Sequence, residues 1–411
     1  SFVTIISGCD VSDEEAEKVT ELNSHCKNKT KKSGGKVTGK KPEIFLRELL
    51  EIDTQNPPGK EDMIVRYIIK RMALNESQYE IFDHGEGRAS LVVSIPGESS
   101  ESVMFLGHID TVPCGDETAW KYKPVHATED GDRIYGLGSS DMKSGVAIML
   151  TVLDTVLKMK KTPKKTLRFV FTADEESGCM GAKRVAKCSW MDDVKEILLS
   201  EPTDGKVVIA EKGVLWILLK IAGRQAHGAM PEEAKNGNEY LWKAIEWIKN
   251  SLPCLEESKL LGKASISTTI FQGGFKSNII PGSAQAVLDV RTVASSNHDQ
   301  IKTCLKQIQE SFEAQYQVRI AYEIKNEKMV LEERTDVPLV KKWLSLYDTA
   351  EYPKGIPYYT DLAELLREND GEFVICGPGR MKKMHNVDEY VTRAQLEKVT
   401  EKYLEYMNQY C

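Results

Sequence analysis

The chain has 411 residues, of which 41% are hydrophobic, and its formal net charge is −7. A chain of this length exceeds the size at which single hydrophobic cores stop growing, so we expect two domains. The acidic balance argues against nucleic-acid and membrane-surface partners, and no segment approaches the ~20 consecutive apolar residues that a membrane helix needs.

The first 41 residues are predicted to form an extension that precedes the folded domains. Residues 27–41 are basic, polar and contain glycine, so they cannot bury a core and are typical of a flexible linker, whereas residues 14–22 could form a short helix. The nine cysteines show no paired spacing, and no signal-peptide pattern is found. We therefore expect free thiols and a cytoplasmic location.

Four predicted elements in the first half of the chain lie next to clusters of acidic or histidine residues. Residues 102–106, 167–173 and 196–200 are short apolar runs that predict buried strands, and residues 146–157 predict an amphipathic helix. The strands lead into the segments GHIDTVP, DEESG and EPT, and the segment GSSDMK precedes the helix. Because ligands bind at the carboxyl ends of strands in open α/β sheets, we expect these clusters to converge.

A fifth cluster, Met384-His385-Asn386, lies near the end of the chain. Metal sites are built from deprotonated His, Asp and Glu side chains, and two ions about 3.5–4 Å apart need a carboxylate between them and capping ligands on each side. A single acidic run or histidine is usually just a solvated or satisfied group. Five such clusters in order, four of them placed between strands and helices, favour a site for two divalent metal ions.

These clusters and their flanking residues resemble the dinuclear zinc amidohydrolases of metallopeptidase family 20, and the resemblance spans about residues 45–403. The family includes acetylornithine deacetylase, succinyl-diaminopimelate desuccinylase and glutamate carboxypeptidase. The segment at His385 departs from the Ala-His commonly seen there, but the following Val-Asp-Glu-Tyr-Val restores the likeness. The resemblance implies a set of five ligands in which His108 and Glu201 hold one ion, Glu176 and His385 hold the other, and Asp141 bridges the two.

The resemblance also implies how the centre works. Glu175 would be the general base that activates a metal-bridging water, and Asp110 would hydrogen-bond the imidazole of His108 and fix its tautomer. Two metal ions lower the pKa of a shared water and polarise a carbonyl, so an amide bond can be cleaved without a covalent intermediate. Zinc suits the His and carboxylate ligands, and cobalt or manganese would fit the same set.

The pattern of predicted elements changes between residues 213 and 328. The predicted order is strand 214–222, helix 238–250, strands 264–271 and 284–292, helix 299–316 and strand 318–324. That order is the split βαβ of a ferredoxin-like sandwich. We therefore expect residues 213–328 to be an inserted α+β domain. Residues 42–212 and 329–411, with a closing helix at 394–410, would form a zinc-peptidase-like α/β catalytic domain with a mostly parallel central sheet.

The resemblance assigns further residues to the inserted domain, which would serve as a lid and as the contact of a possible homodimer. His227, in the segment Ala-His-Gly, would donate a hydrogen bond to the oxyanion, often across a dimer interface. Asn278 and Arg291 would bind substrate, since the planar guanidinium suits a carboxylate, although a surface salt bridge also explains Arg291. Loops that contain Thr360, Gly377 and Gly379 would line the substrate pocket.

The expected activity is removal of an acyl group from the α-nitrogen of an amino acid, as in the deacetylase and desuccinylase. The Asp-Met-Lys at residues 141–143 and the Glu at position 201 are more similar to the deacylase and carboxypeptidase branches than to the aminopeptidase branch. A carboxypeptidase or dipeptidase acting on short peptides is one alternative. A catalytically silent binding protein is another, and the presence of all five expected ligands and Glu175 argues against it.

Overall fold

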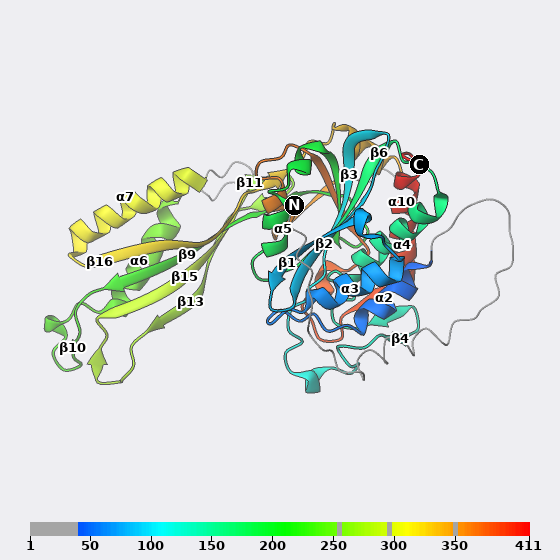
Figure 1. The fold of residues 1–411 in the computed structure, drawn as a ribbon. Helices are drawn as coiled ribbons and strands as arrows, with labels where there is room; N and C mark the ends of the chain where they lie inside the picture. The colour runs from blue at the N-terminus through cyan, green and yellow to red at the C-terminus, as the bar shows by residue number, and fades with distance from the viewer. Residues whose placement is uncertain (1–39, 253–256, 294–297, 348–351) are drawn as a thin grey trace. The chain divides into compact units, whose positions relative to one another are not determined.

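The computed structural model describes residues 40–252, 257–293, 298–347 and 352–411 (Figure 1). The predicted helix at residues 14–22 and nearly all of the predicted linker lie outside these ranges. Within them, no helix is long and apolar enough to cross a membrane. The cytoplasmic location expected from the cysteine pattern stays a prediction.

A nine-stranded mixed sheet organises the larger part of the chain, in the order β1-β2-β6-β3-β7-β19-β8-β17 with β18 beside β8. Its strands are β1 (Tyr79–Gly85), β2 (Arg88–Ile95), β3 (Ser99–His108), β6 (Lys165–Thr172), β7 (Val194–Pro202), β8 (Val208–Glu211), β17 (Leu331–Glu332), β18 (Lys354–Ile356) and β19 (Glu372–Gly377). The central strands β6, β3, β7 and β19 are parallel, whereas β1, β2 and β17 pair antiparallel. The predicted parallel character is therefore concentrated at the centre, where three of the motif-bearing strands lie.

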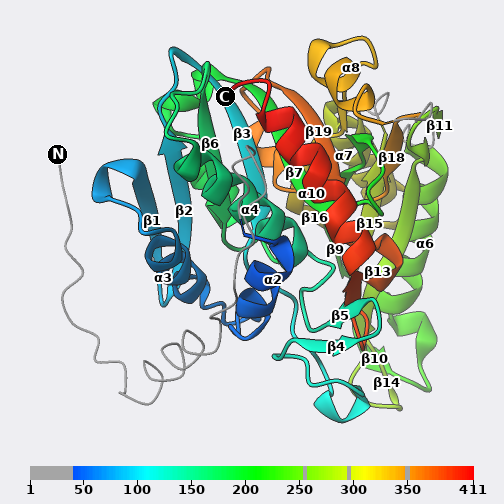
Figure 2. The same ribbon diagram turned by 90° about the vertical axis from the view of Figure 1, so that its right-hand side faces the viewer.

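Helices cover both faces of this sheet. One core contains residues of α2 (Pro42–Leu50), α3 (Glu61–Met72), α4 (Lys143–Met159) and α10 (Arg393–Met407), and a second core on other sheet residues includes α5 (Met180–Val185) and α9 (Leu362–Leu365). The short helix α8 (Pro338–Leu344) contacts β19. Figure 2 shows α2, α4 and α10 in front of the central strands. The sheet is thus the middle layer of an α/β sandwich, as predicted from the sequence.

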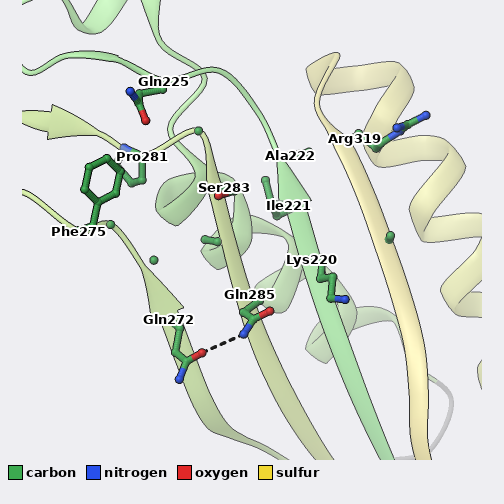
Figure 3. A pocket seen from close by; sticks show the side chains of 15 residues that line it. Lys220, Ile221, Ala222, Gln225, Gln272, Phe275, Pro281, Ser283, Gln285 and Arg319 are labelled. Carbon is green, nitrogen blue, oxygen red and sulfur yellow. Dashed lines mark hydrogen bonds between the residues drawn. The ribbon is translucent and has the colours of Figure 1, made fainter.

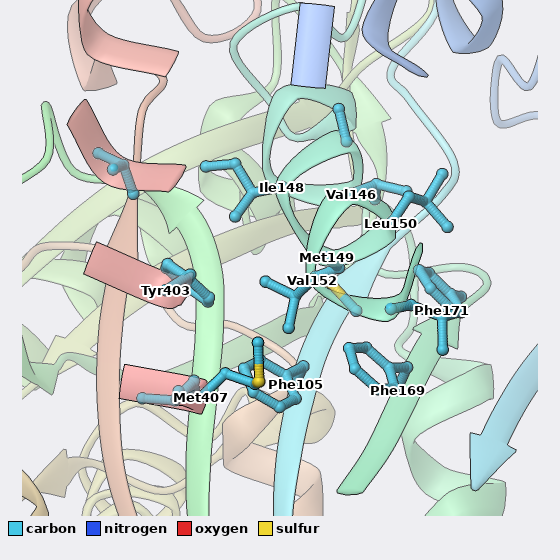
Figure 4. Close-up of a cluster of buried hydrophobic side chains, with 14 of the residues drawn as sticks. Phe105, Val146, Ile148, Met149, Leu150, Val152, Phe169, Phe171, Tyr403 and Met407 are labelled. Carbon is cyan, nitrogen blue, oxygen red and sulfur yellow. The ribbon is translucent and has the colours of Figure 1, made fainter. Parts of the chain in front are cut away.

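The helix α4 is apolar almost all round, and it is the central helix of the first core. Val152 of α4 lies near Phe105 (Figure 4), whose ring stacks on that of Phe169 at 4.8 Å between centroids. Burial of each large apolar side chain contributes about 1.5–3 kcal/mol. At Gly145 the helix comes so close to β7 that an added Cβ would lie 2.3 Å from the backbone oxygen of Ser200. This close packing holds the start of α4 against the end of β7.

The residues between 213 and 328 form a separate four-stranded antiparallel sheet in the order β13-β15-β9-β16. Its strands are β9 (Gly213–Ala222), β13 (Ser265–Gly273), β15 (Ser283–Thr292) and β16 (Arg319–Lys328), and the helices α6 (Gly237–Ser251) and α7 (His298–Tyr316) pack on one face. This is the predicted ferredoxin-like order of strands and helices. The domain boundaries at residues 41, 212 and 328 stay predictions.

Two smaller sheets carry residues that matter below. A two-stranded pair joins β10 (Ala226–His227) to β14 (Ile279–Ile280). A three-stranded sheet contains β4 (Thr128–Asp130), β5 (Arg133–Tyr135) and β20 (Tyr390–Thr392). The second sheet joins the loop before α4 to the last segment of the chain.

Candidate metal centre

The acidic and histidine clusters follow the carboxyl ends of the four central parallel strands. His108 is the last residue of β3, Glu201 is near the end of β7, and Glu175 and Glu176 come three and four residues after β6. His385 lies in the loop after β19. Since carboxyl ends of parallel strands share one edge of a sheet, the strand order itself brings these residues together.

Asp141 lies between the two histidines. Its Oδ1 is 3.1 Å from Nε2 of His108, and its Oδ2 is 3.3 Å from Nε2 of His385. Nε2 of His108 is also 3.4 Å from Oε1 of Glu201, and Nε2 of His385 is 3.1 Å from Oε2 of Glu176. The two oxygens of one carboxylate therefore face two histidine–glutamate pairs, one on each side.

Two overlapping groups of side chains have ligand atoms within 4.8 Å of one another. One contains His108, Glu175 and Glu201, and the other contains His108, Asp141 and Glu176. The pairwise distances separate the same residues differently, since they place Glu176 beside His385 rather than His108. A cluster with a 4.8 Å limit can span both halves of a two-ion site, so the shorter contact of 3.1 Å assigns Glu176 to the side of His385. Nitrogen and carboxylate oxygen are the donors that divalent transition metals accept, so the residues fit such ions.

The buried cluster contains more carboxylates than cationic side chains, and this imbalance shifts the pKa values of its members. Burial raises the pKa of Glu175 and of Glu201 well above its usual value, and nearby carboxylates add to both effects. Hydrogen bonds to Asp141 and Glu176 raise the pKa of His385 to about 10. Burial opposes charge on His108, but Glu201 and other carboxylates nevertheless raise its pKa. Buried carboxylates in excess of cations are a setting that bound divalent ions would relieve.

The centre has one open side. The side chains of His108, Asp141, Glu176 and Glu201 are at most 7% exposed, whereas that of His385 is 49% exposed. A small molecule would therefore reach the cluster from the side of His385.

Asp110 supports the centre from behind, in more ways than the sequence predicted. Its backbone oxygen is 3.1 Å from Nδ1 of His108, and its carboxylate is 3.5 Å from the same nitrogen. The carboxylate also accepts the backbone N–H groups of Glu175 and Glu176, at 3.2 and 3.3 Å. One buried side chain thus orients the first histidine and the segment that carries two functional glutamates.

A chain of polar contacts behind Asp110 was not predicted. Asn56 donates to Asp110 at 2.9 Å and to Asp174 at 3.1 Å, and Arg88 joins Asp174 at 3.0 Å and Glu61 at 2.6 Å. Asp174 has φ 71°, a backbone conformation that non-glycine residues rarely adopt and that these contacts hold in place. The partners are separated by up to 118 residues, so no local motif could reveal them.

The predicted pocket loops are tightly packed against the catalytic sheet. Thr360 is buried and donates to Oε2 of Glu211 at 2.6 Å. An added Cβ at Gly377 would lie 2.1 Å from the backbone oxygen of Ser200, and one at Gly379 would lie 2.2 Å from that of Ser140. These contacts explain the residue types by packing alone. A role in substrate binding stays a prediction.

The predicted residues of the smaller domain have few partners. His227 is exposed, and its Nδ1 accepts the backbone N–H of Ala229 at 3.1 Å. Asn278 is exposed as well. Arg291 makes a two-pronged contact with Asp289 of its own strand, at 2.8 and 3.0 Å. Within the described ranges, no hydrogen bond or ion pair joins these three side chains to the metal centre.

A groove of about 560 Å³ lies elsewhere, on the face of the smaller sheet that the helices leave open (Figure 3). Lys220 and Arg319 lie at its borders, and Gln272 and Gln285 are joined by a 2.9 Å hydrogen bond. Its lining contains no His, Cys, Asp or Glu side chain and none of the predicted site residues. The groove therefore offers no His, Cys, Asp or Glu ligand for a metal ion.

Comparison with known proteins agrees with this geometry. Residues 104–409 match peptidase family M20/M25/M40. The chain belongs to this family. It is accordingly a metallohydrolase that acts on amide bonds. A curated relative, a probable succinyl-diaminopimelate desuccinylase of Staphylococcus aureus, is 26% identical over 381 residues, which are 85% of this chain and 92% of the relative.

Solved structures of family members share the fold. A tripeptidase of Staphylococcus aureus superposes with a TM-score of 0.74 at 19% identity and covers 91% of this chain and 99% of its own. A dinuclear metal-binding peptidase of the M20 family from Bacillus subtilis superposes with a TM-score of 0.67 at 17% identity and covers 89% of this chain and 96% of its own. At these identities the likeness supports the fold, and the substrate needs its own argument.

Proposed function

We propose that this metallohydrolase cleaves the amide bond of an N-acyl amino acid, as a deacetylase or desuccinylase does, at a centre of two divalent metal ions. The observation that carries the proposal is the position of Asp141, whose two carboxylate oxygens face His108 and His385 separately. A carboxylate between two sets of capping ligands is the arrangement that a two-ion site needs. The similarity to a probable desuccinylase supports the choice of substrate class.

The proposed ligands divide into two sets that share Asp141. His108 and Glu201 would hold one ion, and Glu176 and His385 would hold the other. Zinc suits these donors best, with cobalt or manganese as alternatives. When bound, the ions supply a water of lowered pKa and a polarised substrate carbonyl. Asp110 keeps the imidazole of His108 oriented for its ion through the contact at Nδ1.

Glu175 is the proposed general base. Burial and the neighbouring carboxylates raise the pKa of its carboxyl group, which favours a group that accepts a proton and gives it up again. Glu175 would take a proton from the attacking water and deliver it to the departing amine nitrogen. The bond that breaks is then the amide C–N bond, and the products are a carboxylate and an amine.

The remaining proposed roles concern the substrate. His227 would donate a hydrogen bond to the oxyanion, and Asn278 and Arg291 would bind the substrate, with the guanidinium on its carboxylate. Thr360, Gly377 and Gly379 would line the pocket. Small N-acyl amino acids fit a centre that is open on one side only.

The experiment is hydrolysis of a panel of N-acetyl, N-succinyl and N-formyl amino acids and of dipeptides by metal-stripped protein, with and without added zinc or cobalt. We expect zinc or cobalt to restore release of one acyl class. Turnover of dipeptides with all acyl substrates untouched would contradict the deacylase proposal. Metal-independent turnover would contradict the two-ion centre.

A carboxypeptidase or dipeptidase is the second candidate, because solved structures with this fold include an M20 family metallo-carboxypeptidase of Sulfolobus solfataricus and human carnosine dipeptidase 1. It would use the same centre and the same base, since both reactions cleave an amide beside a carboxylate. The dipeptide arms of the same panel separate the two candidates.

We also propose that residues 213–328 act as a lid and dimerisation domain, inserted between the catalytic segments 42–212 and 329–411. The strand β13 lies at the edge of its sheet, and its residues Ile270 and Phe271 are 45% and 42% exposed. Trp242 of the adjacent helix α6 is 55% exposed. Exposed apolar residues beside an edge strand favour pairing with a second chain. Light scattering of the Trp242→Glu variant should show a monomer where the unmodified chain is a dimer.

A further inference from the structure

Two loops of the centre are joined by buried hydrogen bonds through a residue that no motif assigned. Glu389 is 1% exposed and lies four residues after His385. Its carboxylate accepts the backbone N–H groups of Gly138, Ser140 and Asp141, at 2.8, 2.7 and 2.8 Å. The last segment of the chain therefore holds the loop that presents Asp141, 248 residues away.

Further bonds join the same two segments. The backbone N–H of Gly136 donates to the backbone oxygen of Glu389 at 3.1 Å. The hydroxyl of Ser140 accepts the backbone N–H of Arg380 at 2.7 Å and donates to the oxygen of Arg380 at 3.2 Å. The segments that carry Asp141 and His385 thus form one hydrogen-bonded unit.

The three N–H groups explain why a carboxylate stands at this position. Oε1 accepts from Ser140 and Asp141, while Oε2 accepts from Gly138. A glutamine has only one oxygen, so its amide group would turn an N–H toward one of these donors. A buried donor left without an acceptor costs about 1–3 kcal/mol.

We propose that Glu389 is a positioning residue for the metal centre. Its carboxylate fixes the backbone of the 138–141 loop, and through it the place of Asp141 between the two histidines. This inference rests on the two-ion centre proposed above. Glu389 contacts the backbone of Asp141 and acts through it, so its loss would weaken metal binding without removing a ligand.

The neighbouring Asp388 provides a matched control. Its Oδ1 accepts the backbone N–H groups of Lys121 and Tyr122, at 2.9 and 3.1 Å. The chemistry of this contact is the same, a carboxylate on the amides of another loop, but that loop carries none of the proposed ligands. Asp388→Asn keeps an oxygen for both amides, so it reports the effect of removing a carboxylate charge from this segment without disturbing the loop that carries Asp141.

The test compares Glu389→Gln with Asp388→Asn in the full chain. Zinc content after dialysis against buffered free zinc, zinc affinity by chelator competition and the melting temperature of the metal-free forms are measured for both. We expect Glu389→Gln to bind zinc about 10–100-fold more weakly, the range found for outer-shell partners of metal ligands. Asp388→Asn should match the unmodified chain in zinc affinity. Activity of Glu389→Gln should recover as free zinc is raised, and the melting temperature of the metal-free form reports any loss of stability, which bound zinc would also offset.

Two results would overturn the inference. One is a folded Glu389→Gln variant that binds zinc as tightly as the unmodified chain, and the other is an equal loss in Asp388→Asn. If Glu389→Gln does not fold, the shorter Glu389→Asp withdraws the carboxylate from the three amides, and unchanged zinc affinity there would overturn the inference instead. An unmodified chain that binds no zinc, cobalt or manganese would contradict the proposed function itself.

Discussion

The residues proposed for the reaction occupy two regions that differ in how firmly they are held. At the edge of the larger sheet, His108, Asp141 and Glu201 are almost fully buried, and each contacts residues from distant segments. On the smaller domain, His227 is exposed and Arg291 contacts its own strand. The comparison teaches that folding alone brings the buried residues of the proposed metal centre together, whereas the proposed partners of the smaller-domain residues would come from the substrate.

This difference has a physical basis. Buried carboxylates and imidazoles are stable only with compensating partners, so their positions are fixed during folding. An exposed histidine is hydrated and needs no protein partner, so its side chain would be available to contact a substrate. Variants of the proposed ligands in the first region should therefore change metal content, and variants in the second region should change kinetics with the metal content unaltered.

The largest effect is expected for Asp141→Asn. An amide has a single acceptor oxygen, so it cannot serve both histidine–glutamate pairs, and we expect loss of both ions and of detectable hydrolysis. Metal analysis and the acyl-substrate assay check this. Asp154→Asn, on the helix α4 that follows Asp141 and where Asp154 pairs with Lys158, should keep both ions. An Asp141→Asn protein with two zinc ions per chain would refute the bridging assignment.

Glu175→Gln should separate metal content from catalytic rate within the first region. Removing a general base costs about 10²–10⁴-fold in rate, while the five proposed ligands stay in place. We expect kcat to fall by that factor with zinc content unchanged. Survival of full activity would show that Glu175 is not the base.

The metal centre was largely predictable because its residues lie next to regular elements. The apolar runs before His108, Glu175 and Glu201 predicted strands. The structure extends the first and third at both ends, whereas β6 begins two residues earlier and ends one residue earlier than predicted. The helix α4 begins at Lys143 rather than at residue 146. The sequence did not predict this start, because Met142 at the N-cap makes no side-chain capping bond that a pattern could reveal. The closing helix ends at Met407 rather than 410.

The outer contacts of the centre were not predictable. Asn56 lies in a segment with no metal-ligand pattern, and Glu389 lies in the family-like segment after His385 without an assigned role. Both residues act through bonds to residues 54 and 248 positions away. Such pairs can be identified only once the strand order is known. The roles of Arg291 and Thr360 depend on a substrate, so neither the sequence nor the fold decides them.

His227→Ala tests the second region. A hydrogen-bond donor aimed at an oxyanion contributes about 2.7–4 kcal/mol, or about 10²–10³-fold in kcat. We expect that loss together with unchanged zinc content and stability, because the exposed imidazole contacts only Ala229 among the bonds given above. A kcat within twofold of the unmodified chain would remove His227 from the mechanism.

Arg291→Ala should show a smaller effect, on binding rather than turnover. Loss of a charged, two-pronged contact with a substrate carboxylate costs about 1.5–3 kcal/mol, so KM should rise about 10-fold or more while kcat changes little. Asp289→Asn is the matched control, because it frees the guanidinium. If both variants leave KM unchanged and alter stability by at most about 1 kcal/mol, Arg291 is an ordinary surface ion pair.

The smallest effect concerns Glu211, which accepts the hydroxyl of Thr360 beneath the centre. Burial raises its pKa from 4.5 to about 8, although the Thr360 bond opposes the shift. Because the folded state favours the protonated form, Glu211 contributes stability that is complete below pH 4.5 and is lost as pH rises through about 8.

Glu211→Gln keeps an acceptor for Thr360 but cannot ionise. We therefore expect the melting temperature of the unmodified chain to fall more steeply between pH 6 and pH 9 than that of the variant, at equal zinc concentration. Glu332→Gln, an exposed change on the neighbouring strand β17, should follow the unmodified profile. If the melting temperatures of the unmodified chain and of Glu211→Gln change equally with pH, the Glu211 carboxyl group is ionised in the folded state and its charge is balanced by a cation. In that case Glu211 would belong, with Asp141 and Glu201, to the group of carboxylates whose charge is balanced by cations.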